Sequence, residues 1–199
     1  MVYGLILAGG KSRRFGSDKR FYSLGGKLLI ERACEIMEKV CDKNFIVVDR
    51  NFPSGLSRLQ AFVLLRDLKD GLGPLMGIYS SLLAIPEGGF IAIPVDMPNL
   101  SVDLLMYIKD KACSYDLIVP VRDGPLPFPG FYSKALLPIF ECLIDRGVYS
   151  IRRLVDFADE GGFKVLTLSF DIVKSFGNPE EILLNVNRRE DIEAQMGNK

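Results

Sequence analysis

The sequence of 199 residues contains no histidine, and its formal net charge at neutral pH is zero. The absence of histidine excludes Ser-His-Asp and Cys-His catalysis, as well as every histidine-ligated metal site. Any catalysis must therefore depend on carboxylates, lysines, arginines, backbone amides or a hard cation. The balanced charge gives no reason to expect a nucleic acid or a membrane surface as a partner.

Cysteine and long apolar runs are scarce as well. The four cysteines form no CxxC pair, which argues against a zinc site or a redox dithiol, and we expect reduced thiols. No apolar run approaches the roughly 18 residues of a membrane helix. The first such run, Tyr3–Ala8, is too short for the core of a signal peptide. These features predict a soluble, cytoplasmic protein.

Short β-rich runs alternate with segments of helical periodicity along the whole chain. The expected strands are Tyr3–Ala8, Asn44–Val48, Ala61–Leu65, Phe90–Val95, Asp116–Val121, Phe128–Tyr132 and Lys164–Leu168. The expected helices are Leu28–Val40, Pro74–Ile85, Val102–Ala112, Ala135–Ile144, Tyr149–Ala158 and Arg189–Met196. This alternation predicts one α/β domain over residues 1–199, with a mostly parallel twisted sheet between two helical layers. Ligands of such sheets bind at the carboxyl ends of the strands.

The segment after the first expected strand resembles a P-loop because it contains Gly10-Lys11-Ser12. A P-loop needs its first glycine at position 5, which is occupied by Leu5. Turn residues, not a helix, follow Ser12, and a GxGxxG dinucleotide motif is also absent. The register therefore argues against a P-loop.

The same segment still has the chemistry of a phosphate-binding loop. Gly9 and Gly10 allow the backbone to approach a ligand closely, and their amides can form an anion-binding concavity. Four cations follow within ten residues: Lys11, Arg13, Arg14 and Lys19. The alternative is a tight turn with a solvated basic face.

The stretch LAGGKSRRFGSDK resembles the LAGGxSxRMGxDK signature of nucleotidyltransferases, and most closely that of the molybdenum cofactor guanylyltransferase family. Phe15 replaces the usual methionine of this signature. Related sugar-phosphate and cytidylyl transferases, whose loops read LAAGxGxRM, are less similar. The resemblance implies a Rossmann-like nucleotidyltransferase fold and an enzyme of the EC 2.7.7 class.

Two carboxylates lie in segments that resemble further motifs of this family. Asp96 is part of VDMP, which resembles the family motif CDMP, and the resemblance implies that Asp96 binds Mg²⁺ and the nucleotide. Asp67 lies just upstream of GPLMG, which resembles the family segment GPLxG and implies a nucleotide contact. Turn preference alone would make Asp67 a structural residue.

Other matches to the family are looser. The segment from Asn185 to Asn187 resembles the closing NxNTPEDL, where the second asparagine either helps to order the metal site or caps the last helix. Asp49 occupies a position where several relatives have asparagine near the nucleotide. Arg152 and Arg153 either contact a substrate phosphate or belong to a solvated helix face.

The resemblance implies transfer of GMP from GTP to the terminal phosphate of molybdopterin, with release of pyrophosphate. Leu7, Ala8 and Gly9 would offer backbone contacts to the base and ribose, and Gly10 would contribute amides to the phosphates. Lys19 would neutralise charge at the α-phosphate, Arg14 would hold the leaving pyrophosphate, and Asp96 would hold Mg²⁺. The family further implies transient contact with proteins that insert molybdenum or receive the cofactor.

Two alternatives remain at the level of sequence. Another Mg²⁺-dependent nucleotidyltransferase, acting with CTP on molybdopterin or on a sugar phosphate, would use the same loop and Asp96. A non-catalytic nucleotide-binding regulator or cofactor-delivery subunit would need neither Lys19 nor a metal at the α-phosphate.

Overall fold

Alternating strands and helices make up the computed structural model, which describes residues 1–9, 18–48, 61–66 and 72–186. The strands are β1 (Val2–Leu7), β2 (Ser23–Leu24), β3 (Lys27–Leu28), β4 (Asn44–Val48), β5 (Val63–Arg66), β6 (Gly89–Pro94), β7 (Leu117–Pro120), β8 (Gly130–Ser133) and β9 (Val165–Leu168). The α-helices are α1 (Leu29–Glu38), α2 (Pro74–Leu83), α3 (Val102–Lys111), α4 (Leu137–Asp145), α5 (Ile151–Glu160), α6 (Phe170–Lys174) and α7 (Pro179–Ile182). Two short 3₁₀ helices, η1 (Lys19–Phe21) and η3 (Lys134–Leu136), complete the described elements.

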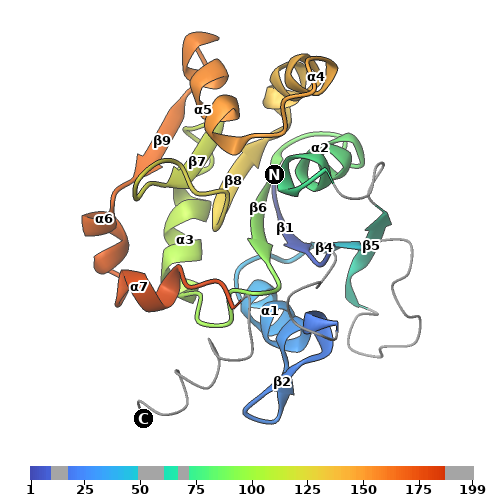
Figure 1. The fold of residues 1–199 in the computed structure, drawn as a ribbon, viewed down its shortest axis with the longest axis vertical. Coiled ribbons are helices and arrows are strands. Elements are labelled where there is room, and N and C mark those ends of the chain that lie inside the picture. The colour runs from blue at the N-terminus through green and yellow to red at the C-terminus, as the bar shows by residue number, and fades with distance from the viewer. Residues whose placement is uncertain (10–17, 49–60, 67–71, 187–199) are drawn as a thin grey trace.

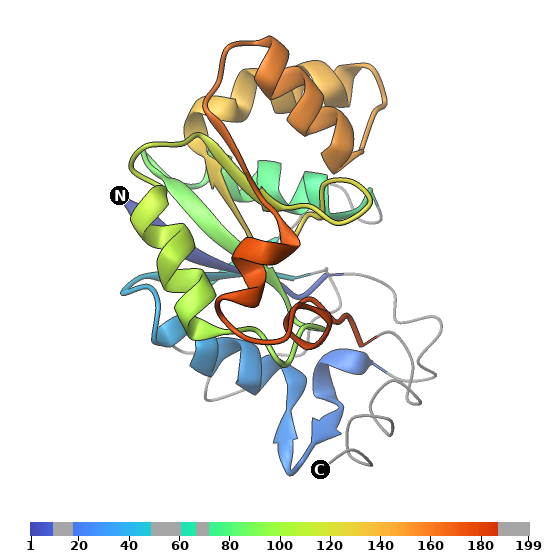
Figure 2. The same cartoon turned by 90° about the vertical axis from the view of Figure 1, so that its left-hand side faces the viewer.

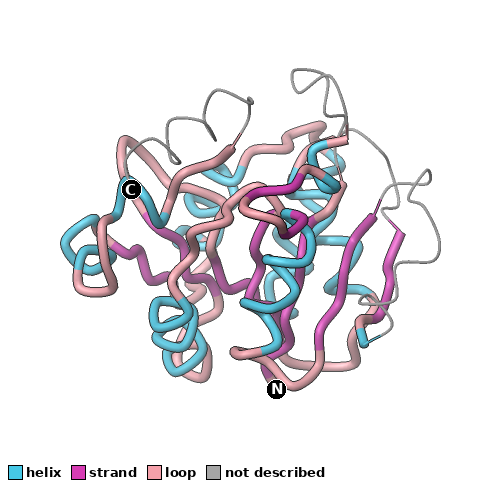
Figure 3. The backbone as a smooth tube through the Cα atoms, turned by 90° about the horizontal axis from the view of Figure 1, so that it is seen from below, coloured by secondary structure: helices cyan, strands magenta, loops and turns pink. Residues whose placement is uncertain are grey.

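Seven of the described strands form one sheet in the order β5-β4-β1-β6-β8-β7-β9 (Figure 1). All neighbouring pairs are parallel except those of β8, which runs antiparallel to both β6 and β7. Figure 3 shows the strands in magenta crossing the molecule, with helices in cyan on either side. The predicted mostly parallel α/β fold is therefore confirmed, with one reversed strand in its second half.

Side chains alternate between two apolar cores, one on each face of this sheet. In β1, for example, Ile6 packs into the core beneath α1 and α3, whereas Leu5 packs into the core beneath α2, α4 and α5. Both side chains are fully buried. The continuous apolar character of the central strands follows directly, because strands covered on both faces have no solvent-facing side.

Capping chemistry sets the beginnings of the predicted helices. Ser101 accepts a hydrogen bond from the backbone N–H of Leu104 at 3.4 Å, as expected of an N-cap serine. Pro74 occupies the first turn of α2, where its missing N–H costs nothing. With these bounds, none of the helices in the described part of the chain is long and apolar enough to cross a membrane.

Short elements account for the differences from the predicted pattern. The two-residue strands β2 and β3 form a hairpin that projects below α1 in Figure 2. Neither this hairpin nor the short helices α6 and α7 has enough residues to produce a periodic signal. The predicted closing helix Arg189–Met196 lies outside the described residues.

Candidate active site

The carboxyl end of β1 places three of the predicted nucleotide-binding residues beside β4 and β6. The N–H of Ala8 donates to the carbonyl oxygen of Val47 at 2.8 Å, and the N–H of Val95 donates to the carbonyl oxygen of Leu7 at 3.2 Å. The N–H of Ala8 is therefore already hydrogen-bonded to β4. Its carbonyl oxygen is the backbone group of Ala8 that can accept a hydrogen bond from another residue.

Gly9 is exposed at this strand end. A Cβ added at Gly9 would meet no atom of the described residues within 4 Å. The packing of the described residues therefore does not explain a glycine here. An approaching ligand would explain it, because glycine lets another molecule come close to the backbone.

Lys19 and Asp96 form an ion pair, although 77 positions separate them in the chain. The ammonium group comes from η1, and the carboxylate comes from the turn that follows β6. Their side chains are only 21% and 13% exposed. The fold therefore brings together two of the three residues expected to be catalytic, at the carboxyl ends of neighbouring parallel strands. The third, Arg14, lies outside the described residues.

The second oxygen of Asp96, Oδ1, is buried and accepts no hydrogen bond from any residue in the described part of the chain. A buried carboxylate oxygen without a donor is costly, because it has lost its hydration. The main chain of Asp96 is held from another direction, since the N–H of Val186 donates to its carbonyl oxygen at 2.8 Å. Asn185 and Val186, part of the motif noted near the end of the sequence, thus lie against this turn.

The unpartnered oxygen fits a hard divalent cation such as Mg²⁺, which prefers carboxylate ligands and keeps several coordination positions for phosphates and water. The described residues contain no group of three or more carboxylate, thiol or imidazole side chains that could hold a metal. Asp96 would therefore be one protein ligand of a cation held jointly with a substrate.

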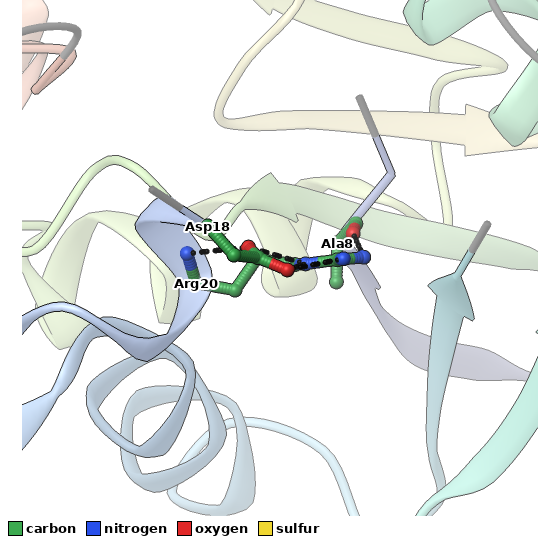
Figure 4. Close-up of polar contacts among 3 residues, drawn as sticks. All are labelled: Ala8, Asp18 and Arg20. Atoms are coloured by element: carbon green, nitrogen blue, oxygen red, sulfur yellow. Dashed lines mark hydrogen bonds and ion pairs between the residues drawn. The ribbon is translucent and has the colours of Figure 1, made fainter. Parts of the chain in front are cut away.

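Asp18 and Arg20 flank Lys19 and form a network of hydrogen bonds at this end of the sheet (Figure 4). The Nε of Arg20 donates to both carboxylate oxygens of Asp18, at 2.8 and 3.0 Å. Its Nη2 donates to Oδ2 of Asp18 at 2.5 Å, and its Nη1 donates to the carbonyl oxygen of Ala8 at 2.7 Å. The Arg20 guanidinium therefore connects the end of β1 to the start of η1.

The charge of Arg20 is buried, and Arg20 as a residue is only 7% exposed. Burial by itself raises the pKa of Asp18, but the hydrogen bonds and the positive charge of Arg20 outweigh this effect, so the pKa lies below its ordinary value. Asp18 thus remains a carboxylate at neutral pH and balances the buried guanidinium.

The sequence pattern alone gives little weight to Asp18 and Arg20. Both stand in a segment of mixed charges in which any cation could face solvent. The available signal is local: an aspartate two residues before a backbone N–H commonly caps a turn, and Asp18 accepts from the Arg20 N–H at 3.1 Å. The burial of Arg20 depends on tertiary contacts with Ala8, which no local pattern reveals.

The GPLMG segment lies at the beginning of α2, close to β1. Gly73 has a positive φ of 80°, and Gly77 packs against Leu7 so closely that an added Cβ would lie 2.9 Å from the Leu7 Cδ2. Gly77 thus lets α2 pack against the end of β1, whereas Gly73 supplies the left-handed backbone conformation just before the helix. Gly10, Arg14, Asp49, Asp67 and Asn187 lie outside the described residues, as do Lys11 and Arg13.

Arg152 and Arg153 are exposed on α5. Arg153 forms an ion pair with Asp156 at 3.7 Å, and its guanidinium lies 5.4 Å from the centre of the Phe157 ring. These contacts stay within the helix itself, as expected of a solvated helix face.

Comparison with known proteins finds relatives that are similar over most of this chain. The molybdenum cofactor guanylyltransferase of Syntrophotalea carbinolica is 31% identical, over 95% of this chain and 88% of the relative. The molybdenum cofactor guanylyltransferase of Desulfosudis oleivorans is also 31% identical, over 96% of this chain and 93% of the relative.

The fold has a solved counterpart as well. The crystal structure of molybdopterin-guanine dinucleotide biosynthesis protein A from Archaeoglobus fulgidus superposes with a TM-score of 0.78 at 23% identity, covering 98% of this chain and 96% of the other. Residues 4–160 match the MobA-like NTP transferase domain. The chain therefore belongs to the MobA-like NTP transferase family, as its resemblance to the molybdenum cofactor guanylyltransferases predicted.

Proposed function

We propose that this protein transfers GMP from GTP to the terminal phosphate of molybdopterin, releasing pyrophosphate and forming the guanine dinucleotide of the cofactor. The observation that carries the proposal is the partly buried Lys19–Asp96 pair beside the glycine-containing end of β1. Nucleotidyl transfer requires a cation and a metal-binding carboxylate at one point, and full-length relatives carry the name of this activity.

The reaction joins two anions without needing a general base. A phosphate oxygen of molybdopterin forms a bond to the α-phosphorus of GTP, and the bond from that phosphorus to the bridging oxygen of pyrophosphate breaks. The attacking phosphate is already ionised at neutral pH, so no proton has to be removed. This chemistry suits a chain that contains no histidine. Catalysis then consists mainly of positioning and electrostatic stabilisation.

Lys19 is the proposed donor to the α-phosphate. Its ammonium group is held against Asp96 and only a fifth of its side chain is exposed, so its position is largely fixed before substrate binds. A preorganised charge in a partly dehydrated site stabilises developing negative charge more strongly than one in water. Gly9 offers open backbone at the end of β1.

Asp96 is the proposed ligand of Mg²⁺ through its carboxylate, including the unpartnered Oδ1. The cation would supply neutralisation of the phosphate charge when bound. Backbone contacts to the base and ribose are proposed for Leu7, Ala8 and Gly9. We further propose that Gly10 contributes its amide to the phosphates and that Arg14 holds the leaving pyrophosphate. Asp67 is proposed to contact the nucleotide.

The wider setting is also a proposal. We propose that residues 1–199 form one nucleotidyltransferase domain, because both apolar cores pack on the same sheet. We place the reaction in the cytoplasm, with transient contact to proteins that insert molybdenum or accept the product.

The test incubates the purified protein with Mg²⁺, with either GTP or CTP, and with either molybdopterin or a sugar phosphate as the acceptor. Pyrophosphate release and the nucleotide attached to the pterin are measured. The proposal predicts turnover with GTP and not with CTP. Turnover with CTP alone, or with a sugar phosphate as the acceptor, would overturn the proposed substrates. Tight GTP binding without pyrophosphate release for any acceptor would instead support a regulatory role.

A further inference from the structure

Arg20 has no role in the proposed chemistry, yet it is among the few charged residues of the described chain that are buried. Burying a guanidinium is costly unless its donors are paired. Arg20 meets this requirement by donating to the Asp18 carboxylate and to the Ala8 carbonyl oxygen (Figure 4). An ion pair at the protein surface would form without burying the guanidinium of Arg20 in this way.

The two partners of Arg20, Ala8 and Asp18, lie on either side of residues 9–17 in the sequence, the segment that contains Gly9 and Gly10. Ala8 directly follows β1 and precedes the segment, whereas Asp18 follows the segment and directly precedes η1. One rigid guanidinium therefore fixes the position of the residues that enter and leave this segment. Lys19 lies between Asp18 and Arg20, so any displacement of this pair displaces the main chain of Lys19 as well.

We propose that Arg20 is a positioning residue of the active site, whose guanidinium holds η1 against the end of β1 so that Lys19 faces Asp96. This inference rests on the proposed function. Arg20 acts through Lys19 and does not itself touch the substrate. Lysine cannot replace it, because a single ammonium group lacks the planar fork that reaches the Asp18 carboxylate and the Ala8 carbonyl together.

Arg20→Lys keeps the positive charge and removes the fork. The expected result is a fall in kcat of about 10- to 100-fold, since small misplacements of catalytic groups are that costly. The dissociation constant of GTP, measured by equilibrium dialysis without acceptor, should change far less than kcat. A 10- to 100-fold rise in the dissociation constant of GTP with no change in kcat would overturn the proposal.

Arg32→Lys is the matched control. Arg32 also donates to a main-chain carbonyl oxygen, that of Leu24, and it takes no part in the proposed chemistry. This variant should retain the kcat of the unsubstituted protein. The control separates the two hypotheses: if neither the unsubstituted protein nor Arg32→Lys turns over GTP, the proposed function fails. If both turn over and Arg20→Lys equals them, the inference about Arg20 fails.

A double-mutant cycle shows whether Arg20 acts through Lys19. Single-turnover rates are compared for Arg20→Lys, Lys19→Ala and the double variant. Two residues that act as one unit have non-additive effects, so Arg20→Lys should cost almost nothing once Lys19 is already alanine. Additive losses would contradict the proposal. If Arg20→Lys does not fold, as judged by circular dichroism, Asp18→Asn weakens the same contact from its exposed side and takes its place in the cycle.

Discussion

The pair of Lys19 and Asp96 concentrates opposite charges at the carboxyl ends of two neighbouring strands. Lys19→Ala should lower kcat by roughly 10²–10³, because one preorganised electrostatic contact to a developing charge is lost. Pyrophosphate release measures the rate, and circular dichroism checks the fold. Lys164→Ala, which removes an exposed lysine at the start of β9, is the control and should be neutral. Near-normal turnover by Lys19→Ala would contradict its assignment.

Gly9 offers a second prediction for a single residue. Gly9→Ala should leave the melting temperature nearly unchanged, because an added Cβ meets no described atom within 4 Å, yet it should weaken GTP binding several-fold by occupying the space of the ligand. Equilibrium dialysis and thermal unfolding measure the two effects. Gly4→Ala is the contrast: its Cβ would lie 2.0 Å from Asn44 Oδ1, so it should destabilise the fold. Unchanged GTP affinity in Gly9→Ala would argue against a ligand at this backbone.

The elements of the fold depend on local signals to different degrees. Ser101→Ala removes the side-chain acceptor of the Leu104 N–H and should lower the free energy of unfolding by about 1 kcal/mol. Urea denaturation measures the change. Ser114→Ala, in the exposed turn after α3, removes an exposed hydroxyl that lies 3.6 Å from the Cys113 Sγ and caps no helix, so it should change little. Equal effects of both substitutions would show that Ser101 does not act as a cap.

The long central elements could be predicted from sequence because their apolar pattern directly reflects burial. The strand Asn44–Val48 has the predicted bounds, and α3 ends one residue earlier than expected. The hairpin of β2 and β3 is too short for any periodicity. The reversal of β8 depends on its pairing with β6 and β7, which a strand pattern does not encode.

The residues of the candidate site also fall into two groups: those that a sequence motif identifies and those that only the tertiary structure reveals. Lys19 and Asp96 lie in motifs that can be recognised in the sequence, and the fold brings them together. The role of Arg20 was not visible, because it depends on a carbonyl oxygen 12 positions away in the chain. Motifs point to the residues that we propose to touch a substrate, whereas the group that we propose to position them is found only from a tertiary contact.

At the scale of the whole molecule, the buried thiol of Cys41 makes stability depend on pH. Burial raises its pKa to about 11, although the charge of Lys109 acts in the opposite direction. A thiol with a raised pKa contributes stability that is complete below its ordinary pKa of 9.0 and is lost as the pH rises through about 11. The free energy of unfolding should therefore fall over this range. Because other groups titrate there too, Cys41→Ala is the reference and should show a smaller fall; an equal fall would contradict the raised pKa.

The most direct test of the central claim follows the phosphorus atoms of GTP. The protein is incubated with Mg²⁺, molybdopterin and GTP labelled either at the α- or at the γ-phosphate. Guanylyl transfer predicts that the α-label enters the pterin product and the γ-label leaves with pyrophosphate. Release of the γ-label as inorganic phosphate, with no α-label in the pterin, would show that the protein hydrolyses GTP and would contradict the account.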